Sequence, residues 1–386
     1  MHRKSIFLLL SSVSFLVIVG FIMLVSTCVF SAAVFSDGAG EVDGYGEAKK
    51  QAFSLFVGIG ALCVASMIDY RFWKRHVWYI LGMVCLFLAL CFLPGVGLEV
   101  NGERRWIGVG ALRFQPSETA KIAVVIFLAY WFSRHPDCGK DPLRGFLLPL
   151  AIIGVPLSLV LFEVDIGTTA VLAGTAFLIL FVAGVDWKFL SGLVLTAVIG
   201  FLGMLSYAPN RMERIMAFLD PEEHRLGAGF QQWISLMALG SGGITGRGVG
   251  EGRLKMLYMP FAQTDFIFPM IGEEMGLVCT LLVVLAFITI GVCGFVIAFH
   301  APDRFGSLLG IGLVTYLCLQ AFVNIGVTTS ILPNKGIPLP FVSYGGSSLI
   351  IGLAAVGILV NIFRQGKTAD EQNREWVNRQ RITPRV

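Results

Sequence analysis

Long apolar segments dominate this 386-residue chain and decide what it can fold into. A bilayer span needs about 20 mostly apolar residues. The sequence predicts an all-α polytopic membrane protein with ten transmembrane helices, at about 6–33, 53–68, 77–93, 115–132, 146–162, 166–182, 188–205, 267–299, 306–327 and 347–363. The first segment is longer than the roughly 7–15-residue apolar stretch of a secretory signal, so we interpret it as an anchor. The eighth is long enough to tilt or to contain an interfacial turn.

Composition excludes the main soluble classes. Hydrophobic residues make up 56% of the chain and charged residues only 14%, where about 25% charged residues is usual for a soluble protein. The net charge of +4 is small and spread along the chain, so the sequence lacks the basic footprint of a nucleic-acid binder.

Charge placement sets the expected topology. Ten spans put both termini on one side, and the positive-inside rule favours the cytoplasm, with 16 Lys and Arg residues inside and 12 outside. Residues 1–365 then form the transmembrane domain, and 366–386 form a basic cytoplasmic tail. Residues 206–265, between the seventh and eighth helices, form a large extracytoplasmic loop that is too long for a simple connector.

Neither a zinc site nor a disulfide framework is indicated. Eight cysteines are present without a CxxC pair, and five scattered histidines form no HExxH motif. We expect the cysteines to be small buried hydrophobes.

Polar residues of segment 99–121 stand out beside the fourth span. Glu118 and Lys121 are three residues apart, so they share one helical face, either as a self-neutralising ion pair or as part of a wet cavity. Trp106 with Arg104 and Arg105 is either an interfacial anchor or a platform for an anionic ligand. In the next outside turn, Asp165 can cap the sixth span.

The large outside loop carries further candidates. It contains Arg214, Gln231, Lys255 and a glycine-rich run over 240–252. That run is neither a dinucleotide fingerprint nor a P-loop. Glycines of this kind allow close backbone approach, to other helices in the first instance or to a ligand.

Carboxylates begin the eighth span. Asp265 stands where apolar sequence resumes, as either an ordinary N-cap or a base that the helix dipole keeps ionised. Glu273 and Glu274 lie two turns deeper, where an unpaired carboxylate is costly. We therefore expect them to have partners, with Lys121, Arg105 and Lys255 as candidates.

The last outside loop, 332–348, contains three prolines, Lys335 and Ser343. Irregular backbone beside a membrane is tolerated where it is covered or lines a cavity. The loop is therefore either a rigid cap on the tenth span or a cavity wall. From the residues alone, the chain is a transporter or an intramembrane transferase that acts on a lipid-linked anion.

Several motifs in order resemble the SEDS family of bacterial cell-wall proteins over about residues 5–365. They are 101–108, Phe114–Lys121, Asp165–Thr168, Gly229–Gln232 with Ala238–Gly243, Thr264–Phe268 with Gly272–Gly276, and Gly336–Ser348. Segments 211–220 and 332–336 resemble division-type members more than rod-shape-type members. Two motifs depart from the family pattern: Pro260-Phe-Ala-Gln263 replaces Pro-Glu-Ala-His, and Glu163-Val-Asp165 replaces Gln-Pro-Asp.

The resemblance implies a peptidoglycan glycosyltransferase that polymerises lipid II into β-1,4 glycan strands, with inversion, at the outer face of the bacterial cytoplasmic membrane during cell division. It places the catalytic aspartate, a general base, at Asp265. The implied ligands and partners are lipid II, a glycan linked to undecaprenyl pyrophosphate, a class B penicillin-binding protein and other division proteins of the membrane at the septum.

The predicted cavity residues that bind sugar or pyrophosphate are Arg105, Trp106, Glu118, Lys121, Arg214, Gln231, Lys255, Glu273, Glu274, Lys335 and Ser343. Arg105, Lys121, Lys255 and Arg214 are the cations that can stabilise the leaving pyrophosphate. The sequence requires no cofactor; a divalent cation, Mg or Mn, held by Asp265 or Glu273 is the alternative. A lipid II flippase, a rod-shape-type polymerase and a non-catalytic division scaffold are the rival functions.

Overall fold

A computed structural model describes residues 2–35, 45–100, 103–109, 112–207, 209–254 and 263–382. A helix overlaps each of the ten predicted spans in this part of the chain. These helices are α1 (His2–Phe35), α2 (Gly46–Met67), α4 (Val77–Leu90), α5 (Pro116–Arg134), α6 (Leu148–Phe162), α7 (Ile166–Ala183), α8 (Trp187–Tyr207), α11 (Ile267–Phe299), α12 (Arg304–Thr328) and α13 (Gly346–Ile382).

Apolar length alone qualifies seven stretches of the described chain to cross a membrane. The others fall short for visible reasons. The apolar stretches Val77–Leu90 and Trp187–Gly200 are short, and the first turns of α5 carry Glu118 and Lys121. The chain is a multi-pass membrane protein, and the count of ten spans stays a prediction.

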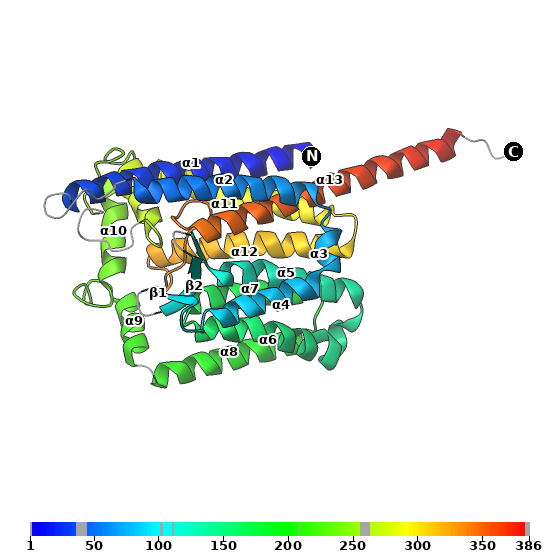
Figure 1. The fold of residues 1–386 in the computed structure, drawn as a ribbon, viewed down its shortest axis with the longest axis horizontal. Helices are drawn as coiled ribbons and strands as arrows, with labels where there is room; N and C mark the ends of the chain where they lie inside the picture. Colours follow the sequence, from blue (N-terminus) through cyan, green and yellow to red (C-terminus); the bar gives the residue numbers. More distant parts are fainter. Residues whose placement is uncertain are drawn as a thin grey trace.

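The long helices lie side by side along the longest axis of the molecule (Figure 1). α1 begins and α13 ends at the same end of the bundle, where the short α3 (Arg71–Arg75) also lies. α9 (Pro209–Leu219), α10 (Phe230–Gly242) and a small sheet lie at the opposite end. The predicted number of crossings and the predicted cytoplasmic side of both termini stay predictions. Between α5 and α6, η1 (Cys138–Lys140) and η2 (Pro142–Leu147) form the connection.

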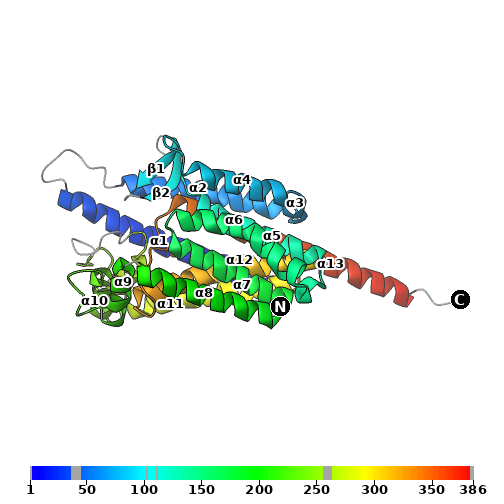
Figure 2. The ribbon, with the colours of Figure 1, turned by 90° about the horizontal axis from the view of Figure 1, so that it is seen from below.

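Segment 97–114 corrects the expectation of an all-α fold. It forms a three-stranded antiparallel sheet of β1 (Gly97–Val100), β2 (Glu103–Val109) and β3 (Leu112–Phe114), in that order. Asn-Gly at 101–102 lies between β1 and β2, and this dipeptide is a strong short-range hairpin signal. The sheet projects beside α2 and α4 (Figure 2).

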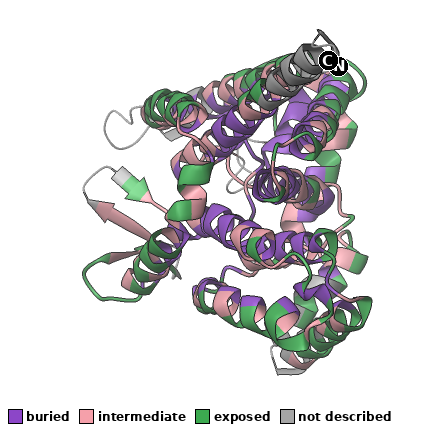
Figure 3. Ribbon diagram, turned by 90° about the vertical axis from the view of Figure 1, so that its right-hand side faces the viewer, coloured by how far each residue is buried: buried purple, intermediate pink, exposed green. Residues whose placement is uncertain are grey.

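The centre of the bundle is formed by α5 and α12. α5 is buried along almost its whole length, and α12 contacts α5, α7, α11 and α13. Buried residues face the interior of the bundle and exposed residues lie at its periphery (Figure 3). Polar side chains on α5 and α12 are therefore enclosed by protein.

α11 is broken inside its predicted span, at Gly276 (φ 76°, ψ −176°). The sequence predicted that this span tilts or contains an interfacial turn; the structure shows a break, and its depth in the membrane stays a prediction. The backbone groups that the break orphans pair with the glycine-rich segment after α10. Leu277 N donates to Gly243 O (3.0 Å), Val278 N to Ile244 O (3.3 Å), Arg247 N to Glu273 O (3.0 Å) and Gly248 N to Glu274 O (3.0 Å).

Close packing explains the glycines at this crossing. A Cβ on Gly242 would lie 1.9 Å from Gly272 O, and one on Gly246 would lie 2.2 Å from Glu274 O. Of the two uses predicted for the run, the structure shows close approach to another helix, which is what a helix break inside a membrane protein requires.

Candidate functional site

Asp265 lies in the turn that leads into α11, outside the apolar span that starts at Ile267. The residue at the N-cap position is Phe266. The interpretation of Asp265 as an ordinary helix cap is therefore wrong. Among the residues that the structure describes, none donates a hydrogen bond to the Asp265 carboxylate. The carboxylate is thus available to a ligand.

Gly336 lies directly against this carboxylate. A Cβ built on Gly336 would be 2.6 Å from Asp265 Oδ2 and 3.4 Å from Cγ. Asp265 thus faces the proline-rich segment between α12 and α13, and the absence of a side chain at position 336 leaves room for it. The segment, called the wall segment below, thus lies against the candidate base, and the predicted cavity stays a prediction.

Asp165 and Arg105 supply the charges around Asp265. Asp165 caps α7, as predicted, by accepting from Thr168 N (2.9 Å). Arg105, on β2, donates from Nε to Glu163 O (3.0 Å) and from Nη2 to Val164 O (3.0 Å). This attaches the sheet to the turn that carries Asp165.

Burial and the Asp165 carboxylate raise the pKa of Asp265, and the Arg105 guanidinium lowers it. The net result is a pKa of about 6. A carboxylate with a pKa near 6 is mostly ionised at neutral pH, yet it is a stronger base than an ordinary aspartate. Both properties suit a general base that takes a proton from a hydroxyl.

Gly336→Ala is expected to displace the Asp265 carboxylate, because the added methyl group occupies its place. We expect the turnover rate to fall by about 10²-fold, the cost of a misplacement of about 1 Å, with an unchanged melting temperature. Gly345→Ala is the matched control, since its nearest neighbour would be the Ser348 Cβ at 3.7 Å. Equal turnover rates in the two variants would show that contact with Gly336 does not determine the position of the Asp265 carboxylate.

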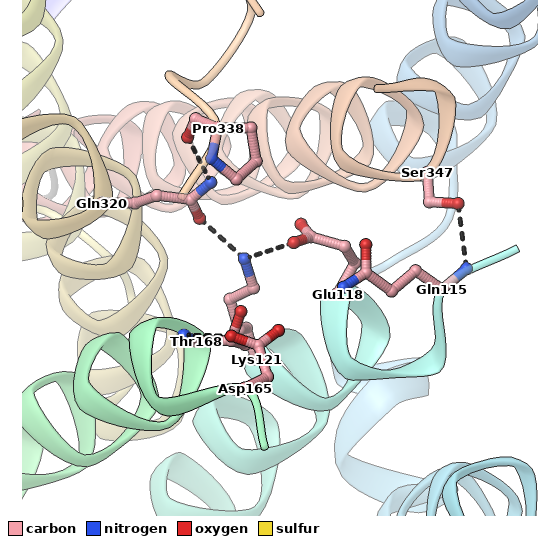
Figure 4. Close-up of polar contacts among 8 residues, drawn as sticks. All are labelled: Gln115, Glu118, Lys121, Asp165, Thr168, Gln320, Pro338 and Ser347. Carbon is pink, nitrogen blue, oxygen red and sulfur yellow. Dashed lines mark hydrogen bonds and ion pairs between the residues drawn. The ribbon is translucent and has the colours of Figure 1, made fainter. Parts of the chain in front are cut away.

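Glu118 and Lys121 form the predicted ion pair inside the bundle (Figure 4). Lys121 Nζ lies 2.8 Å from Glu118 Oε1, and the two side chains are 1% and 3% exposed. Lys121 also donates to Gln320 Oε1 on α12 (2.7 Å), and Gln320 Nε2 donates to Pro338 O (2.9 Å). The structure thus shows the structural alternative, an ion pair that ties α5 to α12 and to the wall segment. A substrate contact for Glu118 or Lys121 stays a prediction.

Glu273 and Glu274 are buried and hold the glycine-rich segment. Glu273 accepts from Arg253 N (2.8 Å) and lies 4.0 Å from Arg247 Nη1. Glu274 accepts from Gly250 N (2.9 Å) and from Ser26 on α1 (2.7 Å). Partners were predicted and are present, but Lys121 is not one of them, because it pairs with Glu118.

The remaining predicted residues are dispersed. Trp106 pairs across the sheet with Leu98. As the strand neighbour of Arg105 it projects from the opposite face, so the two do not form one platform. Gln231 accepts from Asn334 (2.8 Å). Ser343 accepts from Leu339 N (2.7 Å) and so stabilises a turn.

Lys335 belongs to the wall segment and is partly buried. Lys255 lies outside the described residues, as does the side chain of Arg214 on α9. Their roles as substrate contacts stay predictions.

Glu163 is the departure from the family pattern with the clearest structural consequence. Its side chain is 3% exposed, and neither carboxylate oxygen has a hydrogen-bond partner in the part of the chain that the structure describes. Arg105 bonds the backbone of this turn rather than the carboxylate. Burial, and to a smaller extent the Asp165 carboxylate, raise the pKa of Glu163 to about 8 from an ordinary 4.5, although the Cys91 thiol and Arg105 lower it; the group is therefore mostly neutral in the folded protein at pH 7.

Glu163→Gln is expected to remove a pH dependence of stability. Folded protein keeps the Glu163 proton up to about pH 8, whereas unfolded chain loses it near pH 4.5. This group's stability contribution is therefore complete below pH 4.5 and falls as the pH rises through 8. We expect the variant to gain thermal stability over the parent from pH 5 to pH 8. Glu99→Gln, at an exposed ion pair with Arg104, is the control, and its melting temperature should change with pH as that of the parent does. A melting temperature of Glu163→Gln that also runs parallel to the parent across this pH range would show that Glu163 is not buried in its neutral form.

Two site residues escaped sequence reasoning, Gln320 and Asn324. They lie four residues apart within the ninth predicted span, so they share one face of α12. Amide side chains repeated at helical spacing in an apolar segment are the signal that would have found them.

A divalent cation fits Glu273 poorly, because Arg253 N, Leu254 N and Arg247 already satisfy that buried carboxylate. Within the described residues, no three His, Cys, Asp or Glu side chains gather as a metal site would need. We therefore route no chemical step through a metal.

Comparison with known proteins gives consistent matches over nearly the whole chain. The family model described as cell cycle protein, for FtsW, RodA and SpoVE, matches residues 6–368. Stage V sporulation protein E of Bacillus subtilis is 40% identical over 91% of this chain and 95% of its own. The probable peptidoglycan glycosyltransferase FtsW of Geobacter metallireducens is 40% identical over 83% and 85%.

Solved structures share the fold. A structure described as showing the coordination of polymerization and crosslinking by a peptidoglycan synthase complex matches with a TM-score of 0.76 and 28% identity, over 93% of this chain and 97% of that one. The rod shape determining protein RodA of Thermus thermophilus matches with a TM-score of 0.65 and 24% identity, over 92% and 95%.

Proposed function

Because the chain belongs to the FtsW, RodA and SpoVE family of cell cycle proteins, we infer that it is a peptidoglycan glycosyltransferase, and we propose that Asp265 is its general base. The observation that carries the base assignment is a partly buried carboxylate that lies against Gly336 and accepts no hydrogen bond from the described part of the chain. The carboxylates of Glu273 and Glu274, by contrast, accept hydrogen bonds from the glycine-rich segment and from Ser26.

The proposed reaction joins two lipid-linked sugars. The 4-hydroxyl of the acceptor's N-acetylglucosamine attacks the anomeric carbon of the growing strand, and the bond from that carbon to the lipid pyrophosphate breaks. Asp265 takes the hydroxyl proton as the new bond forms, a contribution of about 10²–10⁴-fold for a positioned base. Attack opposite the leaving group inverts the anomeric carbon and gives the β-1,4 link.

The leaving pyrophosphate needs positive charge. Among the predicted cations, Arg105 acts on Asp265 directly, since its charge lowers the pKa of that carboxyl. Its two donor groups hold the turn at Glu163 and Val164, which fixes the guanidinium beside the site. Preorganised charge of this kind stabilises developing negative charge without a reorganisation cost.

We propose that the site faces outward and that a class B penicillin-binding protein is the partner. The structurally similar peptidoglycan synthase complex coordinates polymerization with crosslinking, and a strand polymerase needs a crosslinking enzyme beside it. Resemblance of segments 211–220 and 332–336 to division-type members supports a role at the septum. Depletion of the protein should then give filaments; rounded cells would support the rod-shape role instead.

Product analysis tests the proposed activity against its rivals. Purified protein with its class B partner, reconstituted in proteoliposomes with lipid II and penicillin, should yield long uncrosslinked glycan strands. Movement of lipid II across the bilayer without strands would support a flippase. Binding of the class B partner without glycan strands and without lipid II movement would support a scaffold.

A further inference from the structure

The backbone carbonyl groups of the wall segment 332–340 accept hydrogen bonds from buried side-chain amides. Three of its nine residues are prolines, which have no N–H and cannot sustain regular structure. Its carbonyl groups nevertheless need donors where protein encloses them. Three buried amides supply these donors: Gln232 Nε2 to Leu332 O (3.0 Å), Asn324 Nδ2 to Ile337 O (2.6 Å) and Gln320 Nε2 to Pro338 O (2.9 Å).

Asn324 differs from the other two because it makes a second bond. The same Nδ2 donates to Asp265 O at 2.8 Å. Both N–H groups of the amide are thus used on two carbonyl oxygens, which fixes the side-chain orientation. Asn324 is 1% exposed, so water does not compete for these bonds.

Asp265 O lies one residue before the N-cap Phe266, outside the hydrogen-bond ladder of α11. The ladder cannot extend back to this carbonyl, because the residue four positions later is Pro269, which has no N–H. Asn324 on α12 donates to it instead.

We propose that Asn324 is a positioning residue for the transferase base: by joining Asp265 O to Ile337 O, it sets the Asp265 carboxylate against Gly336. The proposal rests on the proposed function. Gly336 and the Asp265 carboxylate are in close contact, because a methyl group on Gly336 would lie only 2.6 Å from Asp265 Oδ2. Loss of the bridge lets residues 265 and 337 separate, and the carboxylate becomes hydrated and misaligned.

Two volume-conserving variants separate positioning from stability. Asn324→Leu removes the donor to Asp265 and Ile337. Gln232→Met is the matched control, because it removes a buried amide that bonds the same wall segment but not Asp265. Gln232 and Asn324 each also carry a buried amide oxygen without a partner in the described residues, so the two losses are chemically alike.

We expect both variants to melt at lower temperature, and only Asn324→Leu to lose turnover, by about 10²-fold, with an unchanged KM. The acid limb of the pH–rate profile of Asn324→Leu should move to lower pH. Burial is the main cause of the raised Asp265 pKa, so a more hydrated carboxylate has a lower pKa. Equal losses in both variants with an unmoved acid limb, or normal turnover in Asn324→Leu, would overturn the proposal. Failure of the proposed function has a different signature, which is an active Asp265→Asn variant.

A second readout does not depend on activity. Infrared difference spectra against Asp265→Asn report the ionisation of the Asp265 carboxyl during a pH titration. The midpoint should lie lower in Asn324→Leu than in the parent and in Gln232→Met. Coincident midpoints in all three proteins would overturn the positioning role.

Discussion

Asp265→Asn is expected to slow glycan polymerisation by about 10²–10⁴-fold while lipid II binding is retained. The amide keeps the size of the side chain but cannot take a proton from the attacking hydroxyl. Since the carboxylate accepts no hydrogen bond from the described residues, the substitution breaks no hydrogen bond to them, and the amide fits against Gly336 as the carboxylate does. The melting temperature should therefore stay the same or rise, as expected when a partly buried charge is removed.

Steady-state rates and lipid II affinity, measured on the same preparation, check this expectation. Asp137→Asn is a suitable control, because that aspartate is exposed in the connection between α5 and η1, away from the site. Near-normal strand synthesis by Asp265→Asn would show that the carboxylate is not the general base. Loss of lipid II binding together with rate would assign it to ground-state recognition instead.

Lys121→Met should cause the largest loss of stability. Breaking a buried ion pair on one side costs about 3–5 kcal/mol, because the remaining charge is left without a partner. Here Glu118 would be stranded inside the bundle, and Gln320 would lose its ammonium partner on the path to Pro338. We expect little folded protein from this variant and a strongly lowered melting temperature for any that is recovered.

The double variant Glu118→Gln/Lys121→Met tests the cause. Removing both charges removes the desolvation penalty, so we expect most of the stability to return. Thermal unfolding in detergent of the parent and of both variants measures this. A double variant as unstable as Lys121→Met would show that shape or the Gln320 bond, rather than the stranded charge, dominates.

Hydropathy and spacing predicted the bundle well. Each apolar segment became a helix, and the three-residue spacing of Glu118 and Lys121 became a buried ion pair. Helical propensity and the need to satisfy backbone groups within a membrane are local demands, so a single segment reveals them.

Long-range contacts were not visible in the same way. Nothing local to Asp265 shows that Gly336 will lie against it or that Asn324 will bond its carbonyl, since three separate segments must meet. The glycine-rich run likewise gives no sign that it will fill a break at Gly276. The sheet at 97–114 was not predicted, because its strands are short and lie between two apolar segments; the Asn-Gly dipeptide at 101–102 is the local signal for a hairpin.

The pH dependence of kcat/KM tests the central claim most directly, because it reports the ionisation of the free enzyme's essential groups. Polymerisation by the reconstituted wild-type protein should rise with pH through a single ionisation near pH 6, where burial places the pKa of Asp265. Ionised Asp265 accepts the proton, so activity is lost as the pH falls below that value. A rate that stays flat from pH 4.5 to pH 8 would contradict a buried aspartate base.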